Sequence, residues 1–231
     1  MIFITGDTHC PENMEKLKEE NFPQQKRMTK KDYVIICGDF GDIWSAESNE
    51  KKDMLRWLSQ RNFTTLFLDG NWENYGKLNS HTVTVWNGGN IHRLTDSVIH
   101  LMRGQIYHLN HRLFFVMGGA CSKYKELRKQ DGTWWPEEMP STREYHEAWR
   151  NLEKAHYKVD YILTHTAPYS LVTQLRDVEG EYPLNQFLQE VDEKVRYRHW
   201  FFGHFHRDME PDAKHTEVYQ KFIPLPAHLL G

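Results

Sequence analysis

The segment YVIICGDFGD, residues 33–42, contains the pattern that decides this fold: a short apolar run followed at once by glycine and acidic residues. Similar apolar runs cover residues 2–5 and 64–68, and amphipathic stretches lie between them. Short strands that alternate with helices are typical of β-α-β units with a parallel sheet. The first 70 residues therefore predict the beginning of an α/β fold.

The rest of the chain predicts further strands and helices. Between residues 83 and 119, short β-type runs alternate with Asn, Gly and His, which indicates hairpins and a second, mixed sheet. The polar stretch at about 120–142 predicts a long loop insertion. The expected strands are Ile2–Thr5, Tyr33–Cys37, Thr64–Leu68, Val83–Trp86, Val98–Met102, Gln105–Leu109, Leu113–Met117, Tyr161–Thr164 and His199–Phe202, with Val218–Ile223 as a closing edge. The expected helices are Met14–Glu20, Glu47–Gln60, Arg143–His156 and Leu184–Val195.

Composition and charge restrict the class of protein. A chain of 231 residues can bury its own core, and we expect a single domain over residues 1–231. Its net charge of −3 disfavours a protein that wraps nucleic acid. Three cysteines without CxxC spacing argue against a disulfide framework and suit the cytoplasm. Since no stretch approaches the ~18–20 apolar residues of a membrane span, we expect no membrane partner and a cytoplasmic location.

Each strong strand is followed by a small group of residue types that bind metals. The carboxyl ends of strands are where ligands bind in open α/β sheets, and carboxylate, imidazole and amide groups suit Mn, Fe or Zn. In Asp7-x-His9 and His204-x-His206 a spacing of two on extended backbone points both side chains the same way. The glycines before three of these groups allow sharp turns. The five groups are Gly6-Asp7-Thr8-His9, Gly38-Asp39-Phe40-Gly41-Asp42, Asp69-Gly70-Asn71-Trp72-Glu73, Thr164-His165-Thr166 and Gly203-His204-Phe205-His206.

In this order the five groups resemble the pattern of the calcineurin-like metallophosphoesterase superfamily, which reads D-x-H, G-D-x-x-D, G-N-H-[D/E], H and G-H-x-H. The likeness spans residues 6–206. It implies an α/β (α+β) fold, a four-layer β-sandwich of two mixed sheets flanked by helices, and hydrolysis of phosphomonoesters or phosphodiesters. It also implies one metal held by Asp7, His9, Asp39 and His206, and a second held by Asp39, Asn71, His165 and His204.

The resemblance further implies how such a centre works. Two divalent ions, expected to be Mn, Fe or Zn, would be bridged by Asp39, and a hydroxide between them would be the nucleophile. Asp39, Asn71 and His165 would thus act in catalysis through the metals and this hydroxide. Because histidines bind metals as neutral imidazoles, metal occupancy should fall in acid.

The sequence departs from the family pattern at Trp72, where the family has a histidine that serves the leaving group. Indole carries no proton that titrates near neutrality, and the role of Asp42, the expected partner of that histidine, is then in doubt. Three interpretations follow. Another histidine, such as His81 or His92, acts as a weaker acid; or the leaving group needs no proton and Trp72 stacks on an aromatic moiety; or the activity is vestigial.

The substrate is expected to be a small phosphorylated molecule, with nucleotides among the candidates. Nucleic acid is disfavoured because phosphate-backbone binders need cationic tracks. The alternatives are a nuclease, or a catalytically weak or non-catalytic interaction protein on the same fold. Candidate contacts to the substrate are His92, Arg103, Trp72 and Trp134.

Overall fold

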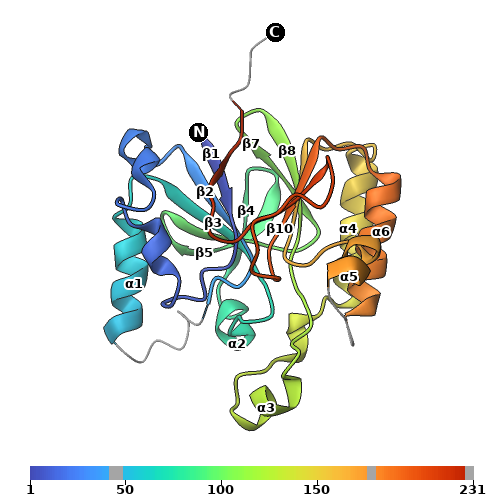
Figure 1. The fold of residues 1–231 in the computed structure, drawn as a ribbon, viewed down its shortest axis with the longest axis horizontal. Helices are drawn as coiled ribbons and strands as arrows, with labels where there is room; N and C mark the ends of the chain where they lie inside the picture. Colours follow the sequence, from blue (N-terminus) through green and yellow to red (C-terminus); the bar gives the residue numbers. More distant parts are fainter. Residues whose placement is uncertain (42–48, 176–180, 227–231) are drawn as a thin grey trace.

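Two mixed β-sheets face each other in the computed structural model, which describes residues 1–41, 49–175 and 181–226 (Figure 1). The first sheet contains β1 (Ile2–Thr5), β2 (Tyr33–Cys37), β3 (Thr64–Leu68), β4 (Val83–Trp86), β5 (Gly89–Thr95), β6 (Val98–Leu101) and β12 (Ile223–Pro224). Its order is β12-β1-β2-β3-β6-β5-β4. The four strands β1, β2, β3 and β6 are parallel, and β12, β5 and β4 pair antiparallel to their neighbours.

The second sheet is smaller and is also mixed. It contains β7 (Gln105–Leu109), β8 (Arg112–Met117), β9 (Tyr161–Thr164), β10 (His199–Phe202) and β11 (His215–Glu217). Its order is β11-β10-β9-β8-β7, and only β7 is antiparallel to its neighbour. The expected sandwich of two mixed sheets is confirmed.

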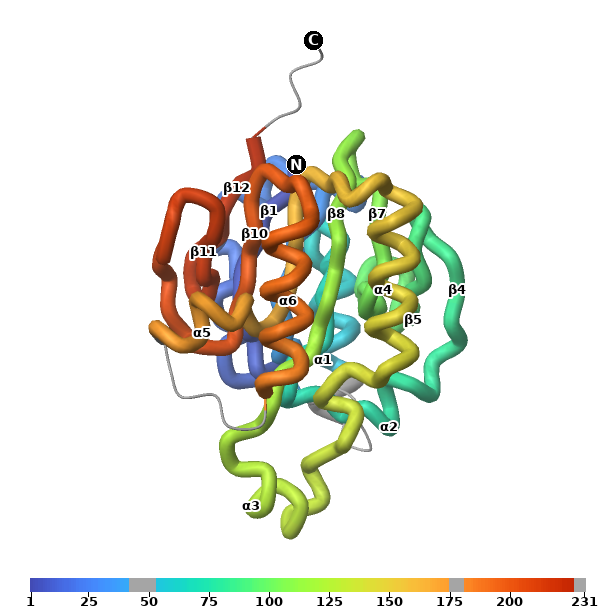
Figure 2. The backbone as a smooth tube through the Cα atoms, turned by 90° about the vertical axis from the view of Figure 1, so that its right-hand side faces the viewer, coloured from blue at the N-terminus to red at the C-terminus, as the bar shows by residue number. Residues whose placement is uncertain are grey.

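Helices cover the outer face of each sheet, so the fold has four layers (Figures 1 and 2). α1 (Asn49–Ser59), with the 3₁₀ turns η1 (Met14–Leu17) and η2 (Pro23–Arg27), lies against the first sheet. The second sheet is covered by α4 (Thr142–Lys154), α5 (Tyr169–Leu175) and α6 (Tyr182–Lys194). Helix α4 begins where it does because Ser141 and Glu144 form a capping box.

The alternation of side chains along each strand divides the core into three layers. In β1, Ile4 enters the layer between the two sheets, whereas Phe3 faces the outer helical layer. In β8, Val116 lies between the sheets and Phe115 packs against the helices. Both faces of these strands are therefore buried, which explains their almost continuous apolar sequence.

The middle of the chain differs from the prediction. The expected second sheet at residues 83–119 is divided: β4, β5 and β6 extend the first sheet, and only β7 and β8 join the second. Strand β5 was missed because Gly89, Asn90 and His92 are turn-type residues, and pairing with β4 and β6 overrides their weak strand propensity. The predicted helix Met14–Glu20 is only the short 3₁₀ turn η1.

The insertion at about 120–142 is not a plain loop. It contains α3 (Lys125–Gln130) and the 3₁₀ turn η3 (Pro136–Glu138), and it projects from the body at one end of the sandwich (Figures 1 and 2). A short helix, α2 (Tyr75–Leu78), follows β3 at the same end. Among the described residues, no helix has the length and apolar character to cross a bilayer.

Truncating one valine between the sheets should destabilise the fold. Val116 is fully buried, so Val116→Ala removes two buried carbons at roughly 0.8 kcal/mol each and leaves a cavity, for a total of about 2 kcal/mol. Val85 on β4 is 76% exposed, and Val85→Ala is the matched control, with an expected change within about 0.5 kcal/mol. Urea unfolding measures both, and equal losses would contradict the assigned core.

Candidate metal centre

Four side chains from three loops converge on one point. The Nε2 atoms of His9 and His206 lie 2.9 Å apart. The Oδ2 atom of Asp7 lies 3.0 Å from His206 Nε2 and 3.7 Å from His9 Nε2, and Oδ2 of Asp39 lies 3.8 Å from His9 Nε2. Imidazole nitrogens and carboxylate oxygens that face one another in this way are a donor set for a divalent cation. We call this group of four the first cluster.

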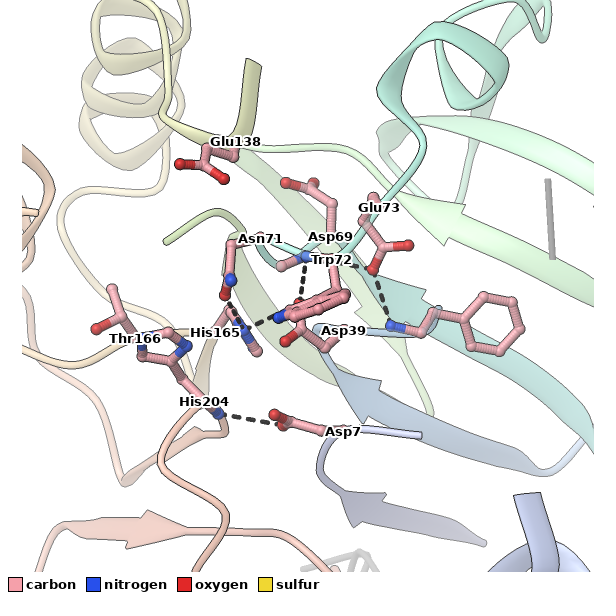
Figure 3. Close-up of polar contacts among 12 residues, drawn as sticks. Asp7, Asp39, Asp69, Asn71, Trp72, Glu73, Glu138, His165, Thr166 and His204 are labelled. Atoms are coloured by element: carbon pink, nitrogen blue, oxygen red, sulfur yellow. Dashed lines mark hydrogen bonds and ion pairs between the residues drawn. The ribbon is translucent and has the colours of Figure 1, made fainter. Parts of the chain in front are cut away.

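A second cluster shares one carboxylate with the first. It comprises Asp39, His165 and His204, and all three are buried. His165 Nε2 lies 3.3 Å from Oδ1 of Asp39 and 3.3 Å from Oδ1 of Asn71 (Figure 3). The two oxygens of Asp39 therefore face different clusters, which is the arrangement of a carboxylate that bridges two ions. The structure brings together all seven predicted ligands.

The imidazole of His165 is held in a defined orientation. Its Nδ1 donates a hydrogen bond of 2.8 Å to the carbonyl of Cys37, which leaves Nε2 to face the second cluster. The backbone of His204 is held likewise, because its N–H donates to Oδ1 of Asp7 over 3.1 Å (Figure 3). Cys37 ends β2 and Asp7 follows β1, so the first sheet orients two ligands that follow strands of the second sheet.

Four of the ligands lie on strained backbone rather than on extended strand ends. The φ angles of His9, Asp39, His204 and His206 are 39°, 46°, 74° and 57°, in the left-handed region that side chains rarely adopt. The spacing of two in His204-x-His206 predicts that both side chains meet at one point, and this prediction is wrong. His204 joins the second cluster and His206 the first, which is the division that the family resemblance implies. The corresponding expectation holds for Asp7 and His9, which share the first cluster.

The glycines before the ligands serve mainly for close approach. A Cβ at Gly70 would lie 2.1 Å from Oδ1 of Asp39, and one at Gly203 would lie 2.4 Å from Oδ1 of Asp7. Only Gly38 also has a left-handed backbone, with φ of 87°. The predicted sharp turn thus requires glycine at Gly38, whereas at the other two positions the requirement is space for a carboxylate.

Charge within the clusters shifts the pKa values of their members. Burial alone would lower the pKa of His165, but the carboxylates of Asp39 and Asp7 outweigh it and raise that pKa to about 10. Burial alone would raise the pKa of Asp39, but the positive charge of His165 outweighs it and lowers that pKa. The hydrogen bond to Asp7 raises the pKa of His206. Without a metal, protons on these histidines balance the buried carboxylates, so a cation that binds here displaces protons.

Comparison with known proteins agrees with this geometry. The family model for calcineurin-like phosphoesterase matches residues 1–208. The chain belongs to this family. Members of the calcineurin-like phosphoesterase family typically bind two divalent metals, and the two clusters supply residues for both. No curated protein sequence matches the chain at a significant level.

The family site opens into a pocket of about 460 Å³ between the clusters and the insertion. Asp39, His204 and His206 are among the residues that line it. Cationic and aromatic residues also line it, namely Trp72, Lys123, Tyr124, Arg128 and Arg207. An anion that enters this pocket therefore meets positive charge as well as the candidate metal ligands.

Trp72 occupies the position of the family histidine and offers no acid to the pocket. Its indole is 47% exposed, and the Arg128 guanidinium lies 4.4 Å from the ring centroid. Its backbone N–H donates to Oδ1 of Asp39 over 2.8 Å. Glu73 does not replace the histidine, because its carboxylate is buried and accepts from the backbone N–H groups of Phe40 and Gly70. Asp42 lies outside the described residues.

His92 and Arg103 do not lie at the metal clusters. They line a separate pocket of about 500 Å³, in which Arg103 and His100 both contact the buried carboxylate of Asp69. Nδ1 of His92 is 3.1 Å from Nδ1 of His100, its partner across the β5–β6 pair. Both residues line this second pocket and neither lines the metal-site pocket, so the geometry does not support either as a substrate contact there. Of the two suggested replacement acids, neither His92 nor His81 is among the described residues that line the metal-site pocket.

Trp134 also lies apart from the residues that line the metal-site pocket in the described structure. The ammonium groups of Lys125 and Lys129 lie 4.6 and 4.9 Å from the centroid of its ring. The tryptophan thus contacts helix α3 within the insertion, and its stacking on a substrate stays a prediction.

Two buried residues near the clusters, Lys16 and Glu181, carry no functional signal in the sequence. Lys16 is buried and donates to the carbonyls of Gly6, Asp7 and Tyr219 at 2.6, 3.0 and 2.6 Å. Burial lowers the pKa of its ammonium group to about 8. Glu181 is buried 3.5 Å from Nε2 of His204. A lysine in an amphipathic stretch predicts a solvated face, so the sequence carries no signal for this role.

Each cluster should lose its metal separately. His206→Ala removes a donor of the first cluster and His204→Ala a donor of the second, so each variant should retain one of two bound Mn²⁺ ions. Asp39→Asn should weaken both ions because its two oxygens face both clusters. Metal analysis of desalted protein gives the counts, with His108→Ala, an exposed histidine, as the control. Loss of both ions from either histidine variant would contradict the division into two clusters.

Binding of Mn²⁺ should weaken as the pH falls. In the metal-free protein His165 holds its proton up to a pKa of about 10, and metal binding must displace it. Between about pH 8 and about pH 6, the apparent affinity should fall about tenfold per pH unit for each proton displaced. Calorimetric titration in buffers of different ionisation enthalpy counts those protons. An affinity that does not change with pH would contradict the assigned protonation.

Proposed function

We propose that this protein is a dinuclear metal-dependent phosphoesterase that hydrolyses small phosphate mono- or diesters. The observation that carries the proposal is the position of Asp39, whose two carboxylate oxygens face two clusters of imidazole and carboxylate donors. This donor set fits two first-row divalent ions, expected to be Mn, Fe or Zn. When bound, such ions acidify a water molecule and offset negative charge on a phosphoryl group.

The residues that line the metal-site pocket indicate which substrates bind there. Lys123, Arg128 and Arg207 line the same pocket as the ligands and favour an anionic substrate. A pocket of about 460 Å³ is in the range of small-molecule sites. Exposed aromatic rings of Trp72 and Tyr124 offer surfaces on which a base or aryl group can stack. We therefore propose a small phosphorylated substrate with an aromatic moiety, nucleotides included, in preference to nucleic acid.

Trp72 determines which esters react well. The indole N–H does not ionise near neutrality, so it cannot protonate a departing alkoxide. A leaving group of low pKa needs no such proton. Of the three interpretations of Trp72, we propose the one in which the enzyme is active toward esters with good leaving groups. A cytoplasmic location stays a prediction.

The preference for leaving groups tests this proposal. With Mn²⁺ supplied, p-nitrophenyl phosphate and bis(p-nitrophenyl) phosphate should be hydrolysed far faster than glycerol phosphate, because help from a general acid is typically worth ~10²–10⁴-fold. Trp72→His should narrow the gap, whereas Trp72→Phe, which keeps an aromatic ring without an acid, should not.

Equal rates for aryl and alkyl esters, unchanged by Trp72→His, would refute the proposed role of Trp72. A protein that binds metal and hydrolyses none of these esters would favour the alternative of a non-catalytic interaction protein.

A further inference from the structure

Three buried residues of the insertion meet behind Asn71. Ser122, Arg128 and Glu138 are 5%, 6% and 1% exposed, and we call them the Ser122 network. Asn71 Nδ2 donates to Ser122 Oγ over 3.1 Å, and one guanidinium N–H of Arg128 donates to the same oxygen. The Ser122 hydroxyl in turn donates to Oε2 of Glu138 over 2.6 Å. Side chains of the insertion, which contains none of the metal motifs, thus contact the predicted metal ligand Asn71.

Every hydrogen-bonding position of the Ser122 hydroxyl is occupied. A hydroxyl offers one proton and two lone pairs, and here the proton goes to Glu138 while the lone pairs accept from Arg128 and Asn71. Toward Asn71, this oxygen can only accept. The amide of Asn71 must therefore present its NH₂ group to Ser122, and its Oδ1 is directed to His165 Nε2, 3.3 Å away in the second cluster.

Glu138 decides the direction of this chain of hydrogen bonds. Its Oε1 accepts from the backbone N–H of Ser122 over 3.0 Å, a group that can only donate. Its Oε2 accepts the hydroxyl proton. Arg128 donates to Ser122 Oγ and also to the backbone carbonyl of Asn71, the latter over 2.6 Å. It therefore links the Ser122 hydroxyl to the backbone of Asn71. The two orientations of an asparagine amide have nearly the same shape, so hydrogen bonds of this kind determine which atom faces the metal.

We propose that Ser122, Glu138 and Arg128 are positioning residues that orient the Asn71 amide, so that its oxygen and not its nitrogen faces the second cluster. The insertion then completes that cluster through its hydrogen bonds to Asn71, without supplying a metal ligand of its own. The proposal rests on the proposed function in one respect: the second cluster must bind a metal ion. Partners that orient ligands in this way are typically worth 10–100-fold in metal affinity or activity.

Glu138→Gln tests the proposal with almost no change of shape. The backbone N–H of Ser122 keeps the amide oxygen of the glutamine, so its NH₂ group takes the place of Oε2 and donates to Ser122 Oγ. Three donors would then face one hydroxyl, and the Asn71 amide should turn over. The second Mn²⁺ ion should bind about 10–100-fold more weakly, while the first is unaffected. Glu137→Gln is the matched control, because it removes the same charge from the adjacent, exposed residue.

Calorimetric titration with Mn²⁺ and electron paramagnetic resonance of the Mn²⁺ pair provide readouts independent of turnover. Asn71→Asp should restore the second ion in the Glu138→Gln background, because a carboxylate has an oxygen on either side. A merely structural role of Glu138 would not be rescued in this way. If Glu138→Gln does not fold, as judged by circular dichroism, Ser122→Ala applies the same test by removing the acceptor.

Wild-type affinity for both ions in folded Glu138→Gln protein, or failure of Asn71→Asp to rescue, would overturn the inference alone. Failure of the wild-type protein to bind a second Mn²⁺ ion would instead overturn the proposed function, so the two outcomes are distinct.

Discussion

The shared carboxylate of Asp39 is the constraint on which the rest of the structure depends. Each of its oxygens faces one cluster, and the backbone N–H of Trp72 fixes one of them. To hold this side chain, the chain accepts a left-handed backbone at Asp39 itself and at Gly38 before it. The carboxylate also restricts the residue at position 70, because only glycine leaves room for it there. Burying such a charge is costly unless it is paired with opposite charge or coordinates a metal ion.

The two sheets make separate contributions to the centre. Loops after β1, β2 and β3 supply Asp7, His9, Asp39 and Asn71, and loops after β9 and β10 supply the remaining three histidines. Neither sheet holds a complete cluster by itself. The packing between the sheets, on which the stability of the fold depends, is therefore also what brings the metal ligands together.

The departure at Trp72 and the insertion after β8 belong to the same part of the molecule. The insertion places the Arg128 guanidinium against the indole and adds cationic side chains to the pocket, while its buried residues hold Asn71. The position that lacks an acid, Trp72, is thus accompanied by positive charge in the same pocket. In the proposed function, such a site favours phosphate esters whose leaving group departs as a stable anion.

The sequence by itself determined the strands that carry the ligands and the residue types at their ends, because apolar runs and metal donors are local properties of the chain. The resemblance of the five motifs to a known family also implied both donor sets. The sequence could not show that β4 to β6 extend the first sheet, since strand pairing depends on partners remote in the chain. Nor could it show the left-handed backbone at His204 and His206, the burial of Lys16, or the hydrogen bonds that join Glu138 to Asn71 through Ser122. Those features depend on backbone strain, desolvation and the direction of hydrogen bonds, which exist only once the two sheets and the insertion have packed together.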